Sequence, residues 1–213
     1  QGGKGIVMSK RPSLARPLAE PYVLYLIVVG VGLGTIMLAQ PARLALIWTT
    51  LAILCLLYQG AHKIEMGYSL PNMGRGALLG LVISAPLLAF LAEPLRGFNE
   101  RLYDTRDVVL LFYQTCFIAA PLEGYFLRGI VQGSKGASVG IALAAATALL
   151  YFLPHAPILI SFIVFVAMGA LSIVYTYVRD RYGLASSIAC HVVVSLMLQV
   201  APSLIALARR LLS

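Results

Sequence analysis

Long apolar runs separated by short polar segments dominate the sequence. The pattern predicts seven membrane spans, at residues 21–40, 44–59, 76–95, 108–132, 141–153, 158–178 and 183–208. Several of these runs approach or exceed the ~20 apolar residues that an α-helix needs to cross a bilayer. We therefore predict an all-α fold, a polytopic transmembrane helical bundle of about seven spans, with six to eight as the range.

The polar segments between these runs predict the connections of the bundle. They are the turn Pro41-Ala-Arg43, a loop at 61–75, a charged loop or interfacial segment at 96–107, a turn at 133–140 and a turn at 179–181. Glu93 and Pro94 are expected to end the third span. The proline-histidine segment 154–157 is expected to break the chain before the sixth.

Two pairs of glycines four residues apart lie within the first and third spans. They are Gly30 with Gly34, and Gly76 with Gly80. Small residues at this spacing allow the backbones of neighbouring membrane helices to approach closely. We therefore expect each pair to face another helix.

The composition agrees with a membrane protein and leaves no room for a separate soluble domain. Of the 213 residues, 60% are apolar and 11% are charged, and the mean hydropathy is +0.90, whereas a soluble domain has about 25% charged residues. We assign 21–213 to one transmembrane domain and 1–20 to an N-terminal flank. Because 1–7 is a Gly-rich stretch before Met8, we expect the native start at Met8.

The net charge of +8 does not indicate nucleic-acid binding. The lysines and arginines are scattered at loops and ends, where they set membrane topology and face anionic headgroups. Ten of them fall on the side of the N-terminus and six, Arg43 among them, on the other, which predicts a cytoplasmic N-terminus. Cys55, Cys116 and Cys190 form no CxxC pair, and we expect buried thiols.

One carboxylate lies inside the apolar sequence. Glu123 is the only Asp or Glu between Asp107 and Asp180. A carboxylate at membrane depth costs several kcal/mol unless it is paired, protonated or facing a polar cavity, so it is a functional-site hypothesis by default. His155 and His191 also lie within apolar runs, whereas His62 falls in a predicted loop. We predict that Glu123, His155 and His191 form one intramembrane site.

Spacing allows these residues to meet. The midpoint between Glu123 and His155 is Val139, within the predicted turn, and an antiparallel pair then shares one depth. His191 and Ser195 are four apart and lie on one helix face, and Tyr151 precedes His155 by the same spacing. Arg128 lies five residues after Glu123, a poor α-helical spacing for a direct pair, so it is expected to anchor surrounding structure or to snorkel.

Three short motifs containing these residues resemble the CPBP family, the CAAX proteases and bacteriocin-processing intramembrane endopeptidases. The family pattern has E-E-x-x-x-R, F-x-x-x-H and H-x-x-x-N elements. Their counterparts here are Glu123 to Arg128 (E-G-Y-F-L-R), Tyr151 to His155 (Y-F-L-P-H) and His191 to Ser195 (H-V-V-V-S). The departures are Gly124 for the second glutamate, Tyr151 for Phe and Ser195 for Asn. The resemblance covers a family-like core at 108–201.

The resemblance implies a glutamate-dependent intramembrane protease that needs no metal or other cofactor. Glu123 would activate water, His155 would hold that water or shuttle protons, and His191 and Ser195 would donate hydrogen bonds to the oxyanion. Arg128 and Tyr151 would support the site. The expected partners are the lipid bilayer and a membrane-anchored or lipidated protein tail as substrate. The expected location is the inner (plasma) membrane of a bacterium or archaeon.

Three other interpretations remain open. One glutamate and two histidines could ligate zinc, although the sequence has no H-E-x-x-H motif and no spare carboxylate to act as base. A non-catalytic family member, such as an immunity or partner protein, would keep the same motifs. A proton-coupled transporter would use intramembrane Glu and His as a relay, although we see no internal repeat of the kind that many transporters have.

Overall fold

The computed structural model describes residues 20–152 and 157–212, and within these residues all the regular structure is helical. The first three helices are α2 (Pro21–Gly34), α3 (Gln40–Ala61) and α4 (Leu70–Tyr103). One continuous helical rod follows. Its segments are α5 (Val108–Phe112), η1 (Tyr113–Ala119), α6 (Ala120–Glu123), η2 (Gly124–Gln132) and α7 (Gly133–Lys135). The remaining elements are α8 (Ala137–Phe152), α9 (Ile158–Tyr182), α10 (Leu184–Ser195), η3 (Leu196–Val200) and α11 (Ala201–Leu212).

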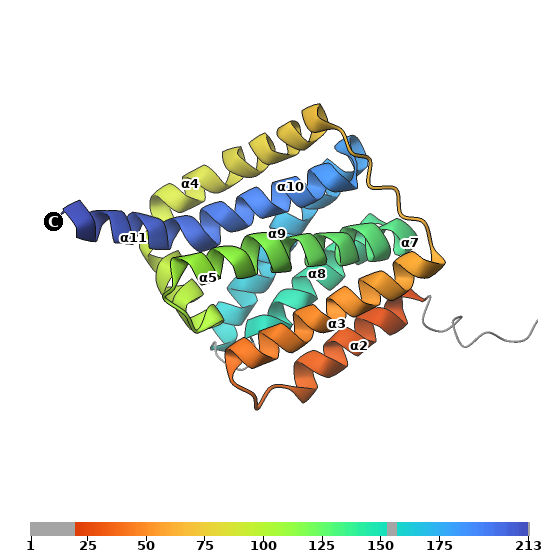
Figure 1. Ribbon diagram of the computed structural model, residues 1–213, viewed down its shortest axis with the longest axis horizontal. Coiled ribbons are helices and arrows are strands. Elements are labelled where there is room, and N and C mark those ends of the chain that lie inside the picture. Colours follow the sequence, from red (N-terminus) through yellow and green to blue (C-terminus); the bar gives the residue numbers. More distant parts are fainter. Residues whose placement is uncertain (1–19, 153–156, 213) are drawn as a thin grey trace, which may run out of the picture.

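The helices form a bundle in which the rod α5–α7 is central (Figure 1). It lies between α3 on one side and α10 on the other, with α4 outside α10 and α2 outside α3. Helices α8 and α9 lie behind this row and pack on each other. The central rod, which carries Glu123, therefore touches helices from both ends of the chain.

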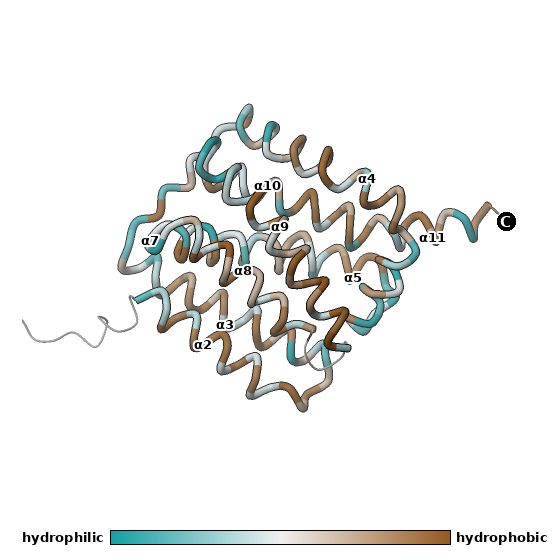
Figure 2. The backbone as a smooth tube through the Cα atoms, turned by 180° about the vertical axis from the view of Figure 1, so that it is seen from behind, coloured by the Kyte–Doolittle hydropathy of each residue, from teal (hydrophilic) through white to brown (hydrophobic). Residues whose placement is uncertain are grey.

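The surface of the bundle is that of a membrane protein. Within residues 20–152 and 157–212, five helical segments are long and apolar enough to cross a bilayer, and α2 and α8 are shorter apolar helices. Leu56, Phe90 and Phe162 are 68%, 86% and 61% exposed, as expected where lipid rather than water is the surrounding solvent. Hydrophilic residues gather at helix ends and connections (Figure 2). The predicted helical membrane bundle is confirmed.

Four predicted connections were wrong in extent. The loop expected at 61–75 is shorter because α4 begins at Leu70, and residues 179–181, expected to be a turn, form the last turn of α9. The helix α4 continues past Pro94, and residues expected in a charged loop form its last turns, where Arg96 pairs with Glu93 at 3.0 Å. Such pairs, three residues apart, stabilise a helix surface. The turn after the central rod is also shorter than the predicted 133–140: α7 ends at Lys135 and α8 starts at Ala137. Gly136, with φ of 91°, makes the reversal in a conformation that favours glycine.

The segment Pro41-Ala-Arg43 is not a turn. It belongs to the first turn of α3, where proline is well tolerated because the N–H it lacks has no partner there. Arg43 is 0% exposed and points into the bundle, so it does not belong among the loop bases used to predict topology. The three cysteines are buried thiols, as predicted.

The two glycine pairs differ in what surrounds them. A Cβ on Gly76 would collide with the main-chain carbonyl of Ser186, and one on Gly80 would lie 2.7 Å from the carbonyl oxygen of Cys190. The close approach predicted for this pair is confirmed, and the neighbour is α10. Gly30 and Gly34 have no described atom within 4 Å of such a Cβ. For them the prediction was wrong.

Candidate active site

Glu123 is the point at which three helices of the bundle meet. Its side chain is buried, and its Oε1 accepts a hydrogen bond of 2.8 Å from the hydroxyl of Tyr151 on α8. Its Oε2 lies 4.0 Å from Nε2 of His191 on α10. The structure therefore brings together three of the residues that the sequence singled out, at one position in the interior.

The turn at Gly136 explains why Tyr151 reaches Glu123. With the reversal centred there rather than at Val139, the residue of α8 at the depth of Glu123 is Leu149. Tyr151 is only two residues further on, and its long side chain spans the remaining distance. His155 lies outside the described residues, so its predicted place in the site stays a prediction.

His191 is held from one side by an aromatic ring and opens on the other to a cavity. Its imidazole stacks on Tyr175 of α9, with ring centroids 4.6 Å apart and planes inclined at 27°. Ser195, one helical turn further along α10, shares the cavity with His191, as their spacing predicted. This cavity has a volume of about 160 Å³ and mostly apolar walls, to which Phe98 and Met168 contribute. His191 and Ser195 are thus part of the wall of a small, mostly apolar chamber.

The central rod is not a regular α-helix at the site. Segments η1 and η2, which flank α6, are π-helical, with hydrogen bonds joining residues five apart. In a π-helix, residues i and i+5 lie nearer to one face than in an α-helix. The poor alignment that we expected between Glu123 and Arg128 assumed α-helical geometry, which this segment does not have.

Arg128 anchors the wall of the site. It is 4% exposed and donates to Ser172 Oγ at 2.7 Å and to the carbonyl of Gly140 at 3.2 Å. Its guanidinium also lies 5.7 Å from the ring centre of Tyr175, the ring on which His191 stacks. This burial and these contacts agree with the predicted anchoring role, which stays a prediction, and they contradict snorkelling to the membrane surface. Arg128 ties the rod, α8 and α9 together behind His191.

A first prediction concerns this anchor. We expect Arg128→Lys to lower the free energy of unfolding by about 2–4 kcal/mol, because one ammonium cannot reproduce the forked contacts to Ser172 and Gly140 while buried. Thermal unfolding in detergent measures the effect. Arg106→Lys, whose side chain is 89% exposed, is the matched control and should change stability little. Equal stability of the two variants would refute the anchoring role.

Gly124, which stands where the family has a second glutamate, faces α10. A Cβ at this position would lie 2.9 Å from Cγ1 of Ile188. Such a distance requires a neighbour to move, so the glycine allows the rod to pack closely against α10 next to His191. A glutamate at 124 would need a different packing of these two helices.

The sequence reasoning missed two contributors to the site. Ser172 and Tyr175 are both buried and both contact Arg128. They lie three residues apart within an apolar span, so they share one helix face. This spacing was a usable signal.

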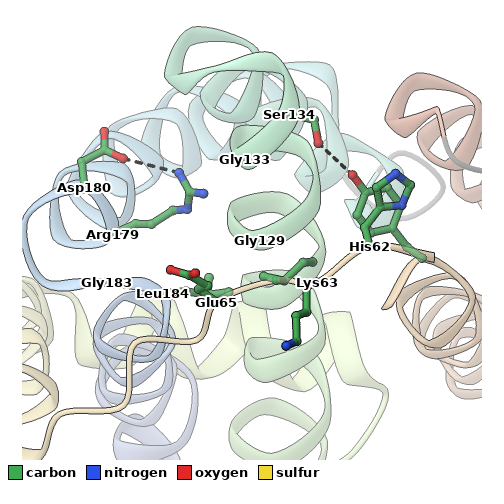
Figure 3. Close-up of a pocket in the computed structure, with 12 residues that line it drawn as sticks. His62, Lys63, Glu65, Gly129, Gly133, Ser134, Arg179, Asp180, Gly183 and Leu184 are labelled. Carbon is green, nitrogen blue, oxygen red and sulfur yellow. Dashed lines mark hydrogen bonds and ion pairs between the residues drawn. The ribbon is translucent and has the colours of Figure 1, made fainter. Parts of the chain in front are cut away.

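Two further cavities outside this cluster are relevant to the site. One, of about 520 Å³, is polar and is formed by the loop after α3 with the ends of η2, α9 and α10 (Figure 3). It contains His62, which stacks on Tyr58 with ring centroids 4.4 Å apart. The other, of about 630 Å³, is apolar and is lined by Leu122 and Val192, the neighbours in sequence of Glu123 and His191.

A comparison with known families identifies the matching part of the chain. Residues 105–197 match the sequence profile of the family described as "Type II CAAX prenyl endopeptidase Rce1-like". Residues 105–197 are therefore similar to the CAAX-protease family. This confirms the family to which the three motifs pointed, and it makes a protease the activity typical of its relatives.

The Rce1-like segment contains every residue predicted for the site. It runs through the central rod, α8, α9 and α10 and leaves α2, α3 and α4 outside the match. Searches of the curated proteins and of the solved structures gave no significant match.

A second prediction concerns the hydrogen bond between Tyr151 and Glu123. We expect Tyr151→Phe to lower the rate of any reaction that uses Glu123 by about 10-fold, because the carboxylate loses the donor that fixes its orientation. The change should appear in kcat rather than in KM. Tyr113→Phe, at a 56% exposed position of the same rod, is the control. An unchanged kcat for Tyr151→Phe would show that the hydroxyl does not act on the reacting group.

Proposed function

We propose that the protein is an intramembrane endopeptidase in which Glu123 activates water to hydrolyse a peptide bond in a membrane-anchored or lipidated protein tail. One observation carries the proposal. Glu123 is a buried carboxylate with one oxygen bound by Tyr151 and the other directed toward His191, in the Rce1-like part of the chain. The proposal places the protein in a bacterial or archaeal inner (plasma) membrane with a cytoplasmic N-terminus.

The separation of Glu123 and His191 suits the binding of a water molecule. At 4.0 Å, Oε2 and Nε2 are too far apart for a direct hydrogen bond, yet one water can bond to both. Tyr151 occupies only Oε1, so Oε2 is left to accept a proton from that water. Glu123 as base takes this proton while the water oxygen bonds to the carbonyl carbon of the substrate.

The remaining steps follow from the same groups. As the carbon–oxygen π bond opens, the negative charge on the carbonyl oxygen is stabilised by hydrogen bonds from His191 and Ser195, which share one helix face. Collapse of this intermediate breaks the carbon–nitrogen bond, and the proton held by Glu123 passes to the leaving nitrogen. In this scheme His155 assists in holding the water or moving the proton.

The apolar groove next to the site supports an apolar substrate. Its lining includes Tyr125, Ile188 and Met73, with few polar groups. Because Leu122 and Val192 connect this groove to Glu123 and His191 along their helices, a lipid-modified or membrane-embedded tail seated there would run past the site. The substrate class is therefore one with a large apolar part next to the scissile bond.

The zinc alternative can be separated from this mechanism by experiment. Within residues 20–152 and 157–212, no three His, Cys, Asp or Glu side chains are grouped as metal ligands. The third ligand that zinc would need, His155, lies outside those residues. Adding a zinc chelator to the assay therefore distinguishes zinc-dependent from metal-free hydrolysis.

The test is hydrolysis by purified protein in liposomes. Wild type and Glu123→Gln would be incubated with a prenylated peptide that ends in a free carboxylate, with and without a zinc chelator, and the products identified by mass spectrometry. Chelator-resistant cleavage that Glu123→Gln loses supports the proposal. Cleavage that chelation abolishes contradicts the metal-free mechanism. A second assay would use, as the source of substrates, membranes from source cells that lack this protein. If neither this peptide nor any protein of those membranes is cleaved, a non-catalytic family member or a proton relay is favoured.

A further inference from the structure

Among the described residues, Arg43 is the largest fully buried side chain, and it lies outside the Rce1-like segment. It comes from the first turn of α3. Its Nε and Nη2 donate to the carbonyl of Gly32 on α2 at 3.2 and 3.1 Å. Its Nη1 donates to the carbonyl of Tyr151 at 3.3 Å, and Nη2 also donates to the carbonyl of Leu150.

The acceptors explain how a charged group can be buried there. Among the described residues they are all main-chain carbonyls, and two of them belong to the last turn of α8. The C-terminal end of a helix carries partial negative charge and carbonyls without helical partners. The carbonyl of Leu150 would ordinarily accept from the N–H of residue 154, which is a proline and has none. Arg43 supplies the missing donors.

The same contact fixes Tyr151, whose hydroxyl binds Glu123. Gln40, also on α3, adds a second donor to the carbonyl of Tyr151 at 3.3 Å. At the other end of the residue, the Trp48 indole of α3 lies near the Tyr151 hydroxyl without completing a hydrogen bond. Helix α3 therefore holds the main chain of Tyr151 and flanks its side chain.

We propose that Arg43 is a positioning residue for the site, one that sets the place of Tyr151 and through it the orientation of the Glu123 carboxylate. The inference rests on the proposed function of Glu123. It assigns a role in the reaction to α3, a helix that contributes no group to the predicted chemistry. A misplacement of about 1 Å can lower a reaction rate ~10²-fold. Loss of a main-chain anchor that lets Tyr151 shift is therefore enough to slow the reaction.

The test is a double-mutant cycle with Arg43→Lys and Tyr151→Phe in the liposome assay. Lysine keeps the charge but cannot reach carbonyls on two helices at once. We expect Arg43→Lys to lower kcat about 10-fold with KM nearly unchanged, and the double variant to be no more than ~3-fold slower than either single one. If the kcat loss of the double variant equals the product of the two single losses, the proposal is overturned, because Arg43 then does not act through Tyr151.

Two further variants separate positioning from support of the fold. Tyr25→Phe removes a different hydrogen bond to the main chain of α8, the one from Tyr25 of α2 to the carbonyl of Leu143 at 3.0 Å, about two turns from Tyr151. Its kcat should match wild type, and a loss equal to that of Arg43→Lys would overturn positioning. If Arg43→Lys does not fold, Gln40→Leu replaces it in the cycle. A lowered kcat that vanishes in the Tyr151→Phe background supports the proposal, and an unchanged kcat overturns it.

Failure of this inference is distinguishable from failure of the proposed function. If wild type cleaves and Glu123→Gln does not, while Arg43→Lys cleaves normally, only the role of Arg43 is refuted. If Glu123→Gln cleaves as well as wild type, the proposed function fails, and the role of Arg43 fails with it.

Discussion

Replacing Glu123 by glutamine is expected to lower peptide hydrolysis by about 10²- to 10⁴-fold, the usual contribution of a positioned general base. The amide cannot take a proton from water at Oε2 or return one to the leaving nitrogen. Initial rates in liposomes with the prenylated peptide measure the effect, and KM should change little because the substrate groove is untouched.

The fold should tolerate this substitution. Glutamine has nearly the volume of glutamate, and its side-chain oxygen can still accept the hydrogen bond from the Tyr151 hydroxyl. It also removes a buried carboxylate, whose ionised form is costly at membrane depth. We therefore expect Glu123→Gln to unfold at a temperature equal to or above that of wild type.

Glu93→Gln is the matched control. Glu93 is 57% exposed at its side chain and pairs with Arg96 and Arg209 at the surface, where ion pairs contribute little. Its hydrolysis rate should equal that of wild type. Substantial hydrolysis by Glu123→Gln, or an equal loss in Glu93→Gln, would contradict the assignment of the base.

Of the substitutions considered, replacing Gly80 by the larger residue valine is expected to lower the free energy of unfolding most. In Gly80→Val the new Cβ would lie 2.7 Å from the carbonyl oxygen of Cys190 and 3.3 Å from Cβ of Val193. A main-chain atom cannot rotate away as a flexible side chain can, so α4 and α10 must separate. We expect the free energy of unfolding to fall by about 3 kcal/mol or more. Because His191 follows Cys190 directly, hydrolysis should fall as well.

Gly30→Val is the control for this prediction, since no described atom lies within 4 Å of a Cβ at Gly30. Denaturant unfolding of both variants in the same detergent gives the comparison. The packing argument predicts a large loss for Gly80→Val and a change within about 0.5 kcal/mol for Gly30→Val. Similar losses at the two positions would mean that glycine matters for helix formation rather than for the approach of α4 to α10.

The sequence alone determined the class of fold and indicated the family. In an apolar run that crosses a bilayer, the backbone N–H and C=O groups must find hydrogen-bond partners within the run, because lipid offers none. A helix provides these partners. The three motifs were enough to indicate the CAAX-protease family. They also selected Glu123, Tyr151 and His191, which the structure brings together.

Only the tertiary structure decided which of two similar patterns makes a contact. Gly30 with Gly34 and Gly76 with Gly80 have the same spacing, but only the second pair faces a neighbouring helix. The spacing sets a face of the helix, whereas the partner of that face depends on how all the helices pack. The same reason explains Arg128, whose partners lie on helices other than its own.

Arg43 shows most clearly what the sequence could not supply. A base next to Pro41 between two apolar runs is typical of a turn at the membrane surface. Its burial depends on acceptors more than 100 residues away at the end of α8, where Pro154 leaves a carbonyl without its helical donor. Hydropathy measures the cost of burying one residue by itself, and the partners that offset this cost exist only after the helices have packed.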